Sequence, residues 1–379
     1  MRVKVVNTAD SNAYASGVTE AARALRAGAL VVFPTETVYG IAANAADPKA
    51  IKRLRALKGR EDAQPFTVHL ARRDAASRYV NEPSAMLRRL ARKLWPGPVT
   101  LLAEQADPQQ TELATLCGPE QLAEIYSNGR VGLRCPQHPV AMRLLGEADV
   151  PVVASSANRR GGAPPTDLAG ALADFGDRVE YAIDAGRTRH GVASTILAVQ
   201  GNTWKIVRQG AVDGRTIERL ARSEILFVCT GNSCRSPMAE YLFRASLGCE
   251  LGLLPEGLEE AGYWVSSAGT LGCAGLHASD GAMQEMARRG IDVSAHRSQP
   301  LTVELVHAAE RIYAMERTHA EAVLRLVPGA VGRVALLDAS RPVADPMGGT
   351  AEAYRVCAEQ IEQAIGVRMK EFLDEDRHW

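Results

Sequence analysis

The sequence has no excess of charge of either sign, because 44 Lys and Arg residues stand against 44 Asp and Glu residues. A chain that binds nucleic acid mainly through a general basic field is therefore not expected, although a local basic pocket stays open. Aromatic residues are also scarce, at 5% of the 379 residues, while hydrophobic residues make up 46% and charged residues 23%. This balance is typical of a globular α/β protein and excludes a wholly disordered chain.

Long apolar runs are missing too. No stretch is apolar over the length needed to cross a bilayer, and the first residues, MRVKVVNTADSNAYASG, lack the apolar segment of a secretory signal. We therefore expect a soluble, cytoplasmic protein that makes no membrane contact. The seven cysteines form no C-x-x-C pair. This favours reduced thiols over a disulfide framework or a zinc site, so no metal site is predicted.

The length predicts two domains, since single hydrophobic cores rarely grow beyond about 250–300 residues. In the first half, helical and strand-like periodicity alternate, and a β-rich stretch follows residue 179, which predicts a large, twisted mixed sheet with helices. The pattern restarts with the apolar run EILFVC, so the predicted domains are residues 1–222 and 223–379. In the second domain, strands alternate with helices, which predicts an α/β fold with a doubly wound parallel sheet.

The first strand of the second half leads into the string CTGNSCRS. Cys229 lies at the predicted end of this strand, Arg235 follows six positions later, and Pro237 suits the first turn of a helix. Such a loop points backbone N–H groups at one place, where they and the helix N-terminus bind an anion and favour a thiolate. Arg235 adds a planar fork for two phosphate oxygens. On spacing alone, a buried cysteine beside a capped helix is an equal alternative.

The full string FVCTGNSCRSPMAE, followed by SSAGT and later by ADPMGG, resembles the low-molecular-weight protein tyrosine phosphatase family over residues 224–379. The resemblance implies that Cys229 is the nucleophile, forming a phosphocysteine, and that Arg235 binds the phosphate without a metal. Asn232 would hold a strained turn of the loop, and Ser236 would donate a hydrogen bond to the thiolate.

Asp345, in the ADPMGG string, matches the general acid of that family, which protonates the leaving group and then activates water. Taken alone, an Asp before a Pro is as readily a plain turn residue.

Two positions bear on the substrate of this predicted phosphatase. Tyrosine-specific members carry a bulky aliphatic residue where this chain has Ser233 and an aromatic residue where it has Met347. A small hydroxyl residue resembles the protein-arginine phosphatase branch instead, so phosphotyrosine and phosphoarginine both stay open. Cys234 is either the partner of Cys229 in a reversible protective disulfide or a packed thiol.

The first half contains no G-x-x-x-x-G-K-[ST] loop, so a nucleotide is not expected to bind in that manner. Lys58 and Arg60 end a basic helix, where the helix dipole alone also favours positive side chains. The string SSAN follows the apolar PVV and places Ser156 and Asn158 at a strand end, a common place for ligand contacts in open α/β sheets.

These stretches, with FPTETVYGIAAN, LRCPQHPV and GVASTI in order, resemble the threonylcarbamoyl-AMP synthase family, which has the YrdC-like fold, over about residues 10–215. The resemblance implies that L-threonine, bicarbonate and ATP condense to threonylcarbamoyl-AMP and pyrophosphate, a step that serves tRNA indirectly through the threonylcarbamoyl-transfer machinery. It implies two groups of site residues. The residues around threonine are Thr35, His69, Arg134 and Ser194, with Arg134 on the carboxylate. The residues that face ATP and its Mg²⁺ are Lys58, Arg60, Ser156, Asn158 and Arg208.

Departures from this second family are small. Ala193 replaces an acidic residue, and VRQG stands in place of LRPG, which bears on Arg208. His69 is as readily a satisfied core histidine. One alternative is an RNA-binding module of the same fold fused to an active cysteine phosphatase, and another is one active enzyme with a degenerate partner. Because both sets of motifs keep their site residues, we expect two working active sites.

Overall fold

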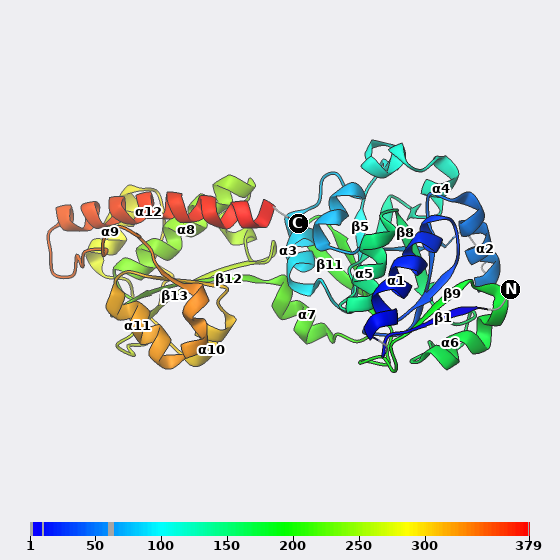
Figure 1. Ribbon diagram of the computed structural model, residues 1–379. Coiled ribbons are helices and arrows are strands. Elements are labelled where there is room, and N and C mark those ends of the chain that lie inside the picture. The colour runs from blue at the N-terminus through cyan, green and yellow to red at the C-terminus, as the bar shows by residue number, and fades with distance from the viewer. Residues whose placement is uncertain (1–2, 10, 60–63, 378) are drawn as a thin grey trace. The chain divides into compact units, whose positions relative to one another are not determined.

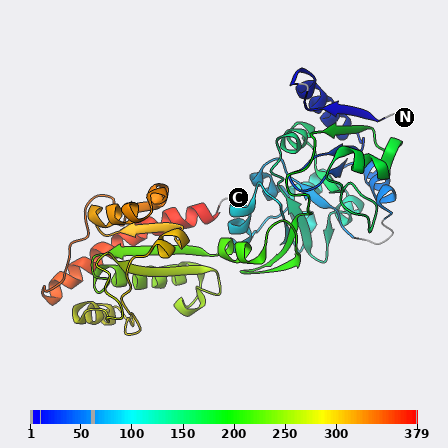
Figure 2. The same cartoon turned by 90° about the horizontal axis from the view of Figure 1, so that it is seen from below.

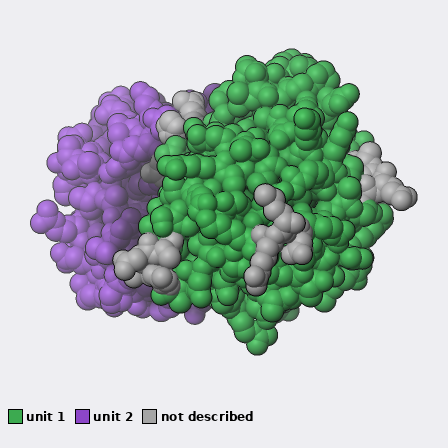
Figure 3. All heavy atoms as spheres, turned by 45° about the vertical axis from the view of Figure 1, so that its right-hand side comes forward, with its two compact units in different colours: residues 1–220, 378–379 green, residues 221–377 purple. Residues whose placement is uncertain are grey.

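The computed structural model describes residues 3–9, 11–59, 64–377 and 379. The chain divides into two compact units, one over residues 1–220 with 378–379 and one over residues 221–377 (Figure 3). Within the part of the chain that is described, no helix has the length and apolar character needed to cross a membrane.

The first unit is built on one large sheet (Figures 1 and 2). Its strands, in order across the sheet, are β1 (Lys4–Asn7), β9 (Tyr181–Asp184), β2 (Val31–Phe33), β3 (Gly40–Asn44), β8 (Val152–Ser156), β4 (Thr67–His69), β7 (Arg130–Arg134), β5 (Val99–Glu104), β10 (Thr195–Gln200) and β11 (Thr203–Arg208). The short β6 (Tyr126–Ser127) pairs with β7. Parallel pairs such as β4–β7 and antiparallel pairs such as β4–β8 alternate irregularly, so the predicted mixed sheet is confirmed.

Helices surround this sheet. They are α1 (Ser11–Arg26), α2 (Pro48–Lys58), α3 (Ala85–Leu94), α4 (Pro119–Ala123), α5 (Pro139–Ala148), α6 (Leu168–Phe175) and α7 (Gly214–Ala221). Helices α1 and α5 pack with the strands in one hydrophobic core cluster, to which they contribute buried residues such as Leu25 and Leu144. Local chemistry sets the ends of α2: the Asp47 carboxylate accepts from the Lys49 N–H, and Gly59 closes the helix at a φ of 59°.

The second unit contains a four-stranded sheet in the order β13 (Tyr263–Gly269), β12 (Ser223–Cys229), β14 (Arg311–Ala314), β15 (Val334–Leu336), and every pair is parallel. Its helices are α8 (Arg235–Leu251), α9 (Asp280–Arg288), α10 (Val303–Ala308), α11 (Arg317–Leu326) and α12 (Ala351–Arg377).

Alternate residues of β12 belong to two different cores, as the period of a strand requires. Phe227 packs with residues of α8, α9 and α12, whereas Val228 packs with residues of α10 and α11. Figure 1 shows these two helix groups on opposite sides of β12 and β13. The sheet is therefore wound on both faces, as predicted, and β12 lies at the point where the strand order reverses, beside which ligands bind in such folds.

Candidate active sites

The string CTGNSCRS forms the connection between β12 and α8, with Cys229 as the last residue of the strand and Arg235 as the first of the helix. The loop lies tightly against β13. A Cβ atom on Gly269 would stand 2.8 Å from the Thr230 carbonyl oxygen and 3.0 Å from the Asn232 nitrogen. Only glycine fits there, which explains the glycine of the SSAGT string as a packing requirement of the loop.

The Cys229 sulfur, on a residue that is 2% exposed, lies 2.9 Å from Ser236 Oγ and accepts the Asn232 backbone N–H at 3.3 Å. Ser236 Oγ itself accepts from Asn232 Nδ2, so the proton of the Ser236 hydroxyl is free to point at the sulfur. Two donors thus converge on Cys229, which is the arrangement that stabilises negative charge on sulfur.

Asn232 holds this loop in shape. Its φ of 52° lies in the left-handed region, where asparagine is better tolerated than most residues. Its Nδ2 donates to Ser236 Oγ and Ser267 Oγ, at 2.9 and 2.8 Å, while Oδ1 accepts from the Gln299 N–H at 2.8 Å. The Asn232 carbonyl contacts His296 Nε2 at 2.8 Å. All the polar groups of the side chain are therefore engaged in fixing one turn.

Arg235 is 3% exposed, and its guanidinium lies beside Asp345. Nη2 donates to Asp345 Oδ2 at 2.5 Å and to Thr230 Oγ1 at 3.1 Å, and Nη1 donates to the Val343 carbonyl at 3.3 Å. Asp345 is 46% exposed and also accepts the Met347 N–H through Oδ1. The structure thus brings Asp345 to the loop from a segment 110 residues away in sequence.

Ser233 is partly exposed, and its carbonyl accepts the Ser279 N–H at 2.8 Å. The neighbouring Cys234 is buried, with its sulfur 3.1 Å from Ser279 Oγ and 3.7 Å from the Tyr354 hydroxyl. Cys229 and Cys234 are both free thiols in this structure.

Sequence reasoning missed two residues at this site, both on or beside α11. His319 lies 2.8 Å from Thr230 Oγ1 through Nε2, and Glu316 Oε1 lies 3.9 Å from Arg235 Nη1. Burial and the Arg235 charge lower the pKa of His319. No motif in the sequence marks these positions, because the segment reads as an ordinary amphipathic helix.

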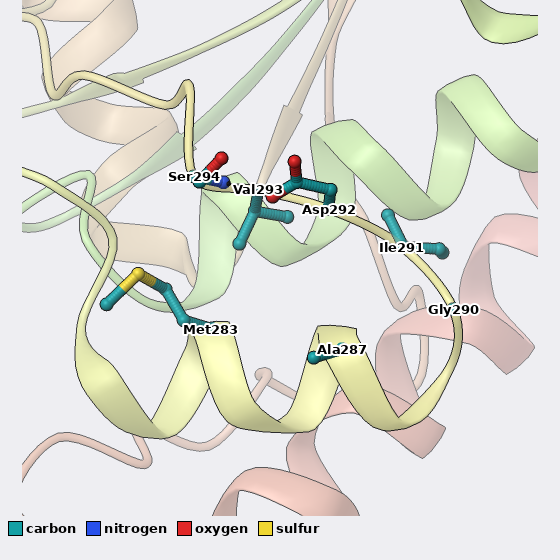
Figure 4. Close-up of a pocket in the computed structure, with 7 residues that line it drawn as sticks. All are labelled: Met283, Ala287, Gly290, Ile291, Asp292, Val293 and Ser294. Carbon is teal, nitrogen blue, oxygen red and sulfur yellow. Dashed lines mark hydrogen bonds between the residues drawn. The ribbon is translucent and has the colours of Figure 1, made fainter.

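A separate hollow of about 420 Å³ lies between α9 and the segment that follows it (Figure 4). Its lining residues are Met283, Ala287, Gly290, Ile291, Asp292, Val293 and Ser294. None of them belongs to the loop around Cys229.

In the first unit, a cavity of about 470 Å³ lies along the sheet. Six predicted site residues line it, namely Thr35, His69, Arg134, Ser156, Ser194 and Arg208. Residues two apart on one strand share a face, which is why both Thr67 and His69 of β4 point here. Further lining hydroxyls come from Thr100 and Ser155.

Two guanidiniums, of Arg134 and Arg208, line this cavity. Arg134 Nη2 donates to Glu36 Oε1 at 2.9 Å and to Thr37 Oγ1 at 2.7 Å, whereas its buried Nε has no partner. Arg208 Nη2 donates to the Ser194 carbonyl at 2.8 Å. Burial and the Arg134 charge lower the pKa of Arg208. Glu36, which neutralises part of this charge, was not predicted as a site residue although it lies within the FPTETVYGIAAN string.

His69 is neutral in this cavity, because burial and the Arg134 charge lower its pKa to about 3. Nδ1 lies 3.2 Å from the Thr67 carbonyl oxygen, so the single ring proton belongs on Nδ1. Nε2 is then left as an acceptor. The ring also contacts Phe33 edge-on, at a centroid distance of 6.0 Å, so the side chain is packed as well as positioned at the site.

Lys58 and Asn158 lie beside the cavity rather than in its lining. The Lys58 ammonium donates to the carbonyls of Ser156, at 2.7 Å, and of Asn158. Asn158 Nδ2 donates to the Arg159 and Gly162 carbonyls. Arg60 lies outside the described residues.

The VRQG string keeps Arg208 next to Ser194. A Cβ atom on Gly210 would lie 2.3 Å from the Ala193 carbonyl oxygen, so this glycine allows the backbone after Arg208 to approach the GVASTI string. The contact forms although VRQG has a glutamine where the family string LRPG has a proline. Among the described residues, no group of three or more His, Cys, Asp or Glu side chains could hold a metal ion.

Two family models match separate parts of the chain. Residues 23–210 match the Sua5/YciO/YrdC family model, described as telomere recombination, and residues 224–378 match the model of low molecular weight phosphotyrosine protein phosphatase. A predicted threonylcarbamoyl-AMP synthase of Mycobacterium tuberculosis is 37% identical over 213 residues, which cover 56% of this chain and 91% of that protein. A protein-arginine-phosphatase of Geobacillus stearothermophilus is 34% identical over 146 residues, 37% of this chain and 90% of that protein.

Among solved structures, a double alanine variant of Sua5 from P. abyssi superposes with a TM-score of 0.50 and 23% identity. The superposition covers 88% of this chain and 99% of that one. At this identity the likeness shows the fold alone. Both resemblances seen in the sequence are confirmed. The chain belongs to the Sua5/YciO/YrdC family through its first unit and to the low-molecular-weight phosphotyrosine protein phosphatase family through its second.

Proposed function

We propose that this chain is a bifunctional cytoplasmic enzyme whose domains meet at residue 222. The first makes threonylcarbamoyl-AMP from L-threonine, bicarbonate and ATP for tRNA modification, and the second hydrolyses phosphoproteins through a phosphocysteine. The first assignment is supported mainly by the cavity with Arg134, Arg208 and His69 on its wall. The second is supported mainly by the convergence of Ser236 Oγ and the Asn232 N–H on the Cys229 sulfur.

In the synthase, the protein acts by positioning and by charge. Arg134 pairs with the threonine carboxylate, and Thr35, Ser194 and the acceptor Nε2 of His69 surround the rest of the amino acid. Ser156 and Arg208 face ATP, with Lys58 and Asn158 beside them. Arg60, also expected to contact ATP, lies outside the described residues. The threonine amine attacks CO₂ and loses a proton, or attacks bicarbonate with loss of water. The resulting carbamate displaces pyrophosphate at the α-phosphorus.

Mg²⁺ is proposed to reach this site with ATP. The lining residues of the cavity include no Asp or Glu, so its ligands there would be phosphate oxygens and water, which suits the way Mg²⁺ usually binds. The chain's own part is to hold the phosphates through arginine and hydroxyl donors.

In the phosphatase, Cys229 attacks the phosphorus, and the bond to the leaving group breaks as Asp345 gives that group its proton. Water then attacks the phosphocysteine, Asp345 takes a proton from the water, and inorganic phosphate leaves with the Cys229 thiolate restored. Arg235 and the loop N–H groups hold the equatorial oxygens in both steps. Ser236 stabilises the departing thiolate in the second.

Asp345→Asn is expected to lower kcat/KM by about 10²–10⁴-fold for aryl phosphates with poor leaving groups, and far less for those with good ones, because only poor leaving groups need the proton. The measurement is a series of aryl phosphates that differ in phenol pKa. Because the Asp345 side chain contacts the same Arg235 Nη2 that phosphate would contact, its replacement by an amide should not weaken inhibition by inorganic phosphate. An equal rate loss across the whole series would assign Asp345 a structural role.

For the substrate, we propose that Ser233 leaves room for a planar guanidinium, so that phosphoarginine is hydrolysed as well as phosphotyrosine. Ser233→Ile is expected to shift the ratio of kcat/KM values toward phosphotyrosine by about 5–150-fold, which corresponds to about 1–3 kcal/mol for a change in pocket shape. Matched peptides that carry either phosphoresidue provide the measurement. If wild type shows no phosphoarginine activity and the ratio is unchanged in the variant, Ser233 is neutral and the substrate is phosphotyrosine.

The whole proposal is tested on the purified chain by two assays. One follows pyrophosphate release that depends on threonine and bicarbonate, and the other follows aryl phosphate hydrolysis in the presence of a chelator. Both activities are expected. Salt-sensitive RNA retention without pyrophosphate release would favour an RNA-binding module in the first unit instead.

A further inference from the structure

We infer that His319, acting through Thr230, is a positioning residue of the phosphatase site that keeps Arg235 in place while Asp345 moves to the leaving group. The inference rests on the phosphatase function proposed for the Cys229 loop. It assigns a role to a buried histidine that the catalytic steps do not use.

The contacts of Arg235 show why a second anchor is needed. Among the described residues, Nη2 donates to two groups, Asp345 Oδ2 and Thr230 Oγ1. Asp345 is 46% exposed and must turn toward the leaving group to give it a proton. At that moment Thr230 is the remaining protein acceptor for Nη2. Thr230 is therefore the contact that keeps the guanidinium aimed at the phosphate oxygens during the transfer.

A lone threonine hydroxyl can rotate freely, and His319 removes that freedom. Nε2 lies 2.8 Å from Thr230 Oγ1 and 3.3 Å from Glu316 Oε1, whereas Nδ1 is buried and has no partner. A buried N–H without an acceptor costs more than an unused lone pair, so the ring proton belongs on Nε2. The N–H groups of His319 and Arg235 then fill both lone pairs of Thr230 Oγ1.

The anchor comes from a rigid element that is independent of the acid. His319 is 3% exposed and lies in the first turn of α11, while Asp345 lies between β15 and α12. Glu316, the N-cap residue of α11, adds a carboxylate 3.9 Å from Arg235 Nη1. A site residue held by a packed helix stays within the narrow geometric range that two-point phosphate binding requires.

The test compares Thr230→Val, which has nearly the same shape but no hydroxyl, with Thr230→Ser, which keeps it. Alongside these, His319→Phe removes the donor and His319→Gln retains an N–H group. The measurements are kcat/KM for one aryl phosphate and the dissociation constant of inorganic phosphate, determined by calorimetry on the full chain. Thr230→Val and His319→Phe are each expected to weaken phosphate binding and to lower kcat/KM by about tenfold, with substantial recovery in Thr230→Ser and His319→Gln.

Non-additivity gives the sharpest readout, because both side chains act through one hydrogen bond. The double variant Thr230→Val, His319→Phe should lose no more than either single variant. Unchanged phosphate binding in Thr230→Val, failure of Thr230→Ser to recover, or fully additive losses would each overturn the inference. A wild-type chain that binds phosphate but hydrolyses no aryl phosphate would refute the proposed phosphatase function, while the calorimetric comparison would still decide whether Thr230 and His319 position Arg235.

Discussion

Cys229→Ser is expected to lower aryl phosphate hydrolysis by at least about 10⁴-fold and to leave threonylcarbamoyl-AMP synthesis at the wild-type rate. The sulfur lies at the end of β12, where Ser236 Oγ and the Asn232 N–H converge on it. A hydroxyl in its place is a far weaker nucleophile at neutral pH, and loss of the nucleophile removes most of the catalysis of a site that acts as a unit.

Cys249→Ser provides the matched control, since Cys249 is an exposed thiol on α8 in the same unit and should tolerate the change. Both activities are measured on each variant. Full phosphatase activity in Cys229→Ser would exclude a phosphocysteine. Loss of synthesis in the same variant would contradict the assignment of the two activities to separate domains.

Most elements of the fold were predictable because their signals are local. The segment PKAIKRLRALK forms α2, the basic helix expected to end near Lys58, and EILFVC lies in β12. β1 and β3 carry no such local signal, for different reasons. The edge strand β1 is defined by pairing with β9, whose residues lie far along the chain, and not by its own pattern. In β3 all five residues are buried, so no alternation of polar and apolar residues marks the strand.

In the candidate sites, too, residues of a contiguous string were predictable, and residues brought in from distant segments were not. The loop from Cys229 to Ser236 is contiguous, and its string carries both the geometry and the chemistry. Partners brought by tertiary contacts carry no such signal. His319 meets Thr230 across 89 residues, and Glu36 meets Arg134 across 98. His319 contacts the threonine to which Arg235 donates, and Glu36 contacts Arg134 directly. A motif built around the arginine does not mark either supporting residue.

Arg134→Ala is expected to raise the KM for threonine by about 30–5,000-fold and to leave aryl phosphate hydrolysis unchanged. Removing one partner from a buried, hydrogen-bonded charge pair costs about 2–5 kcal/mol, and each 1.36 kcal/mol is about tenfold. The Arg134 side chain is 7% exposed and Glu36 is 2% exposed, so the proposed carboxylate contact would be made away from water. Pyrophosphate release at increasing threonine concentration provides the measurement.

This substitution also leaves Glu36 as an unpaired buried carboxylate, which is expected to destabilise the first unit by about 3–5 kcal/mol. The double variant Arg134→Met, Glu36→Gln separates stability from binding, because it removes both charges while keeping similar volumes. Its free energy of unfolding should return toward the wild-type value, since replacing a buried ion pair by neutral groups is often tolerated. Synthesis should stay lost, because no guanidinium remains to meet the threonine carboxylate. A stable double variant that makes threonylcarbamoyl-AMP with a wild-type KM for threonine would contradict the proposed role of Arg134. Arg134 would then serve the fold, and another residue would bind the amino acid. Arg208 is the other arginine on the cavity wall.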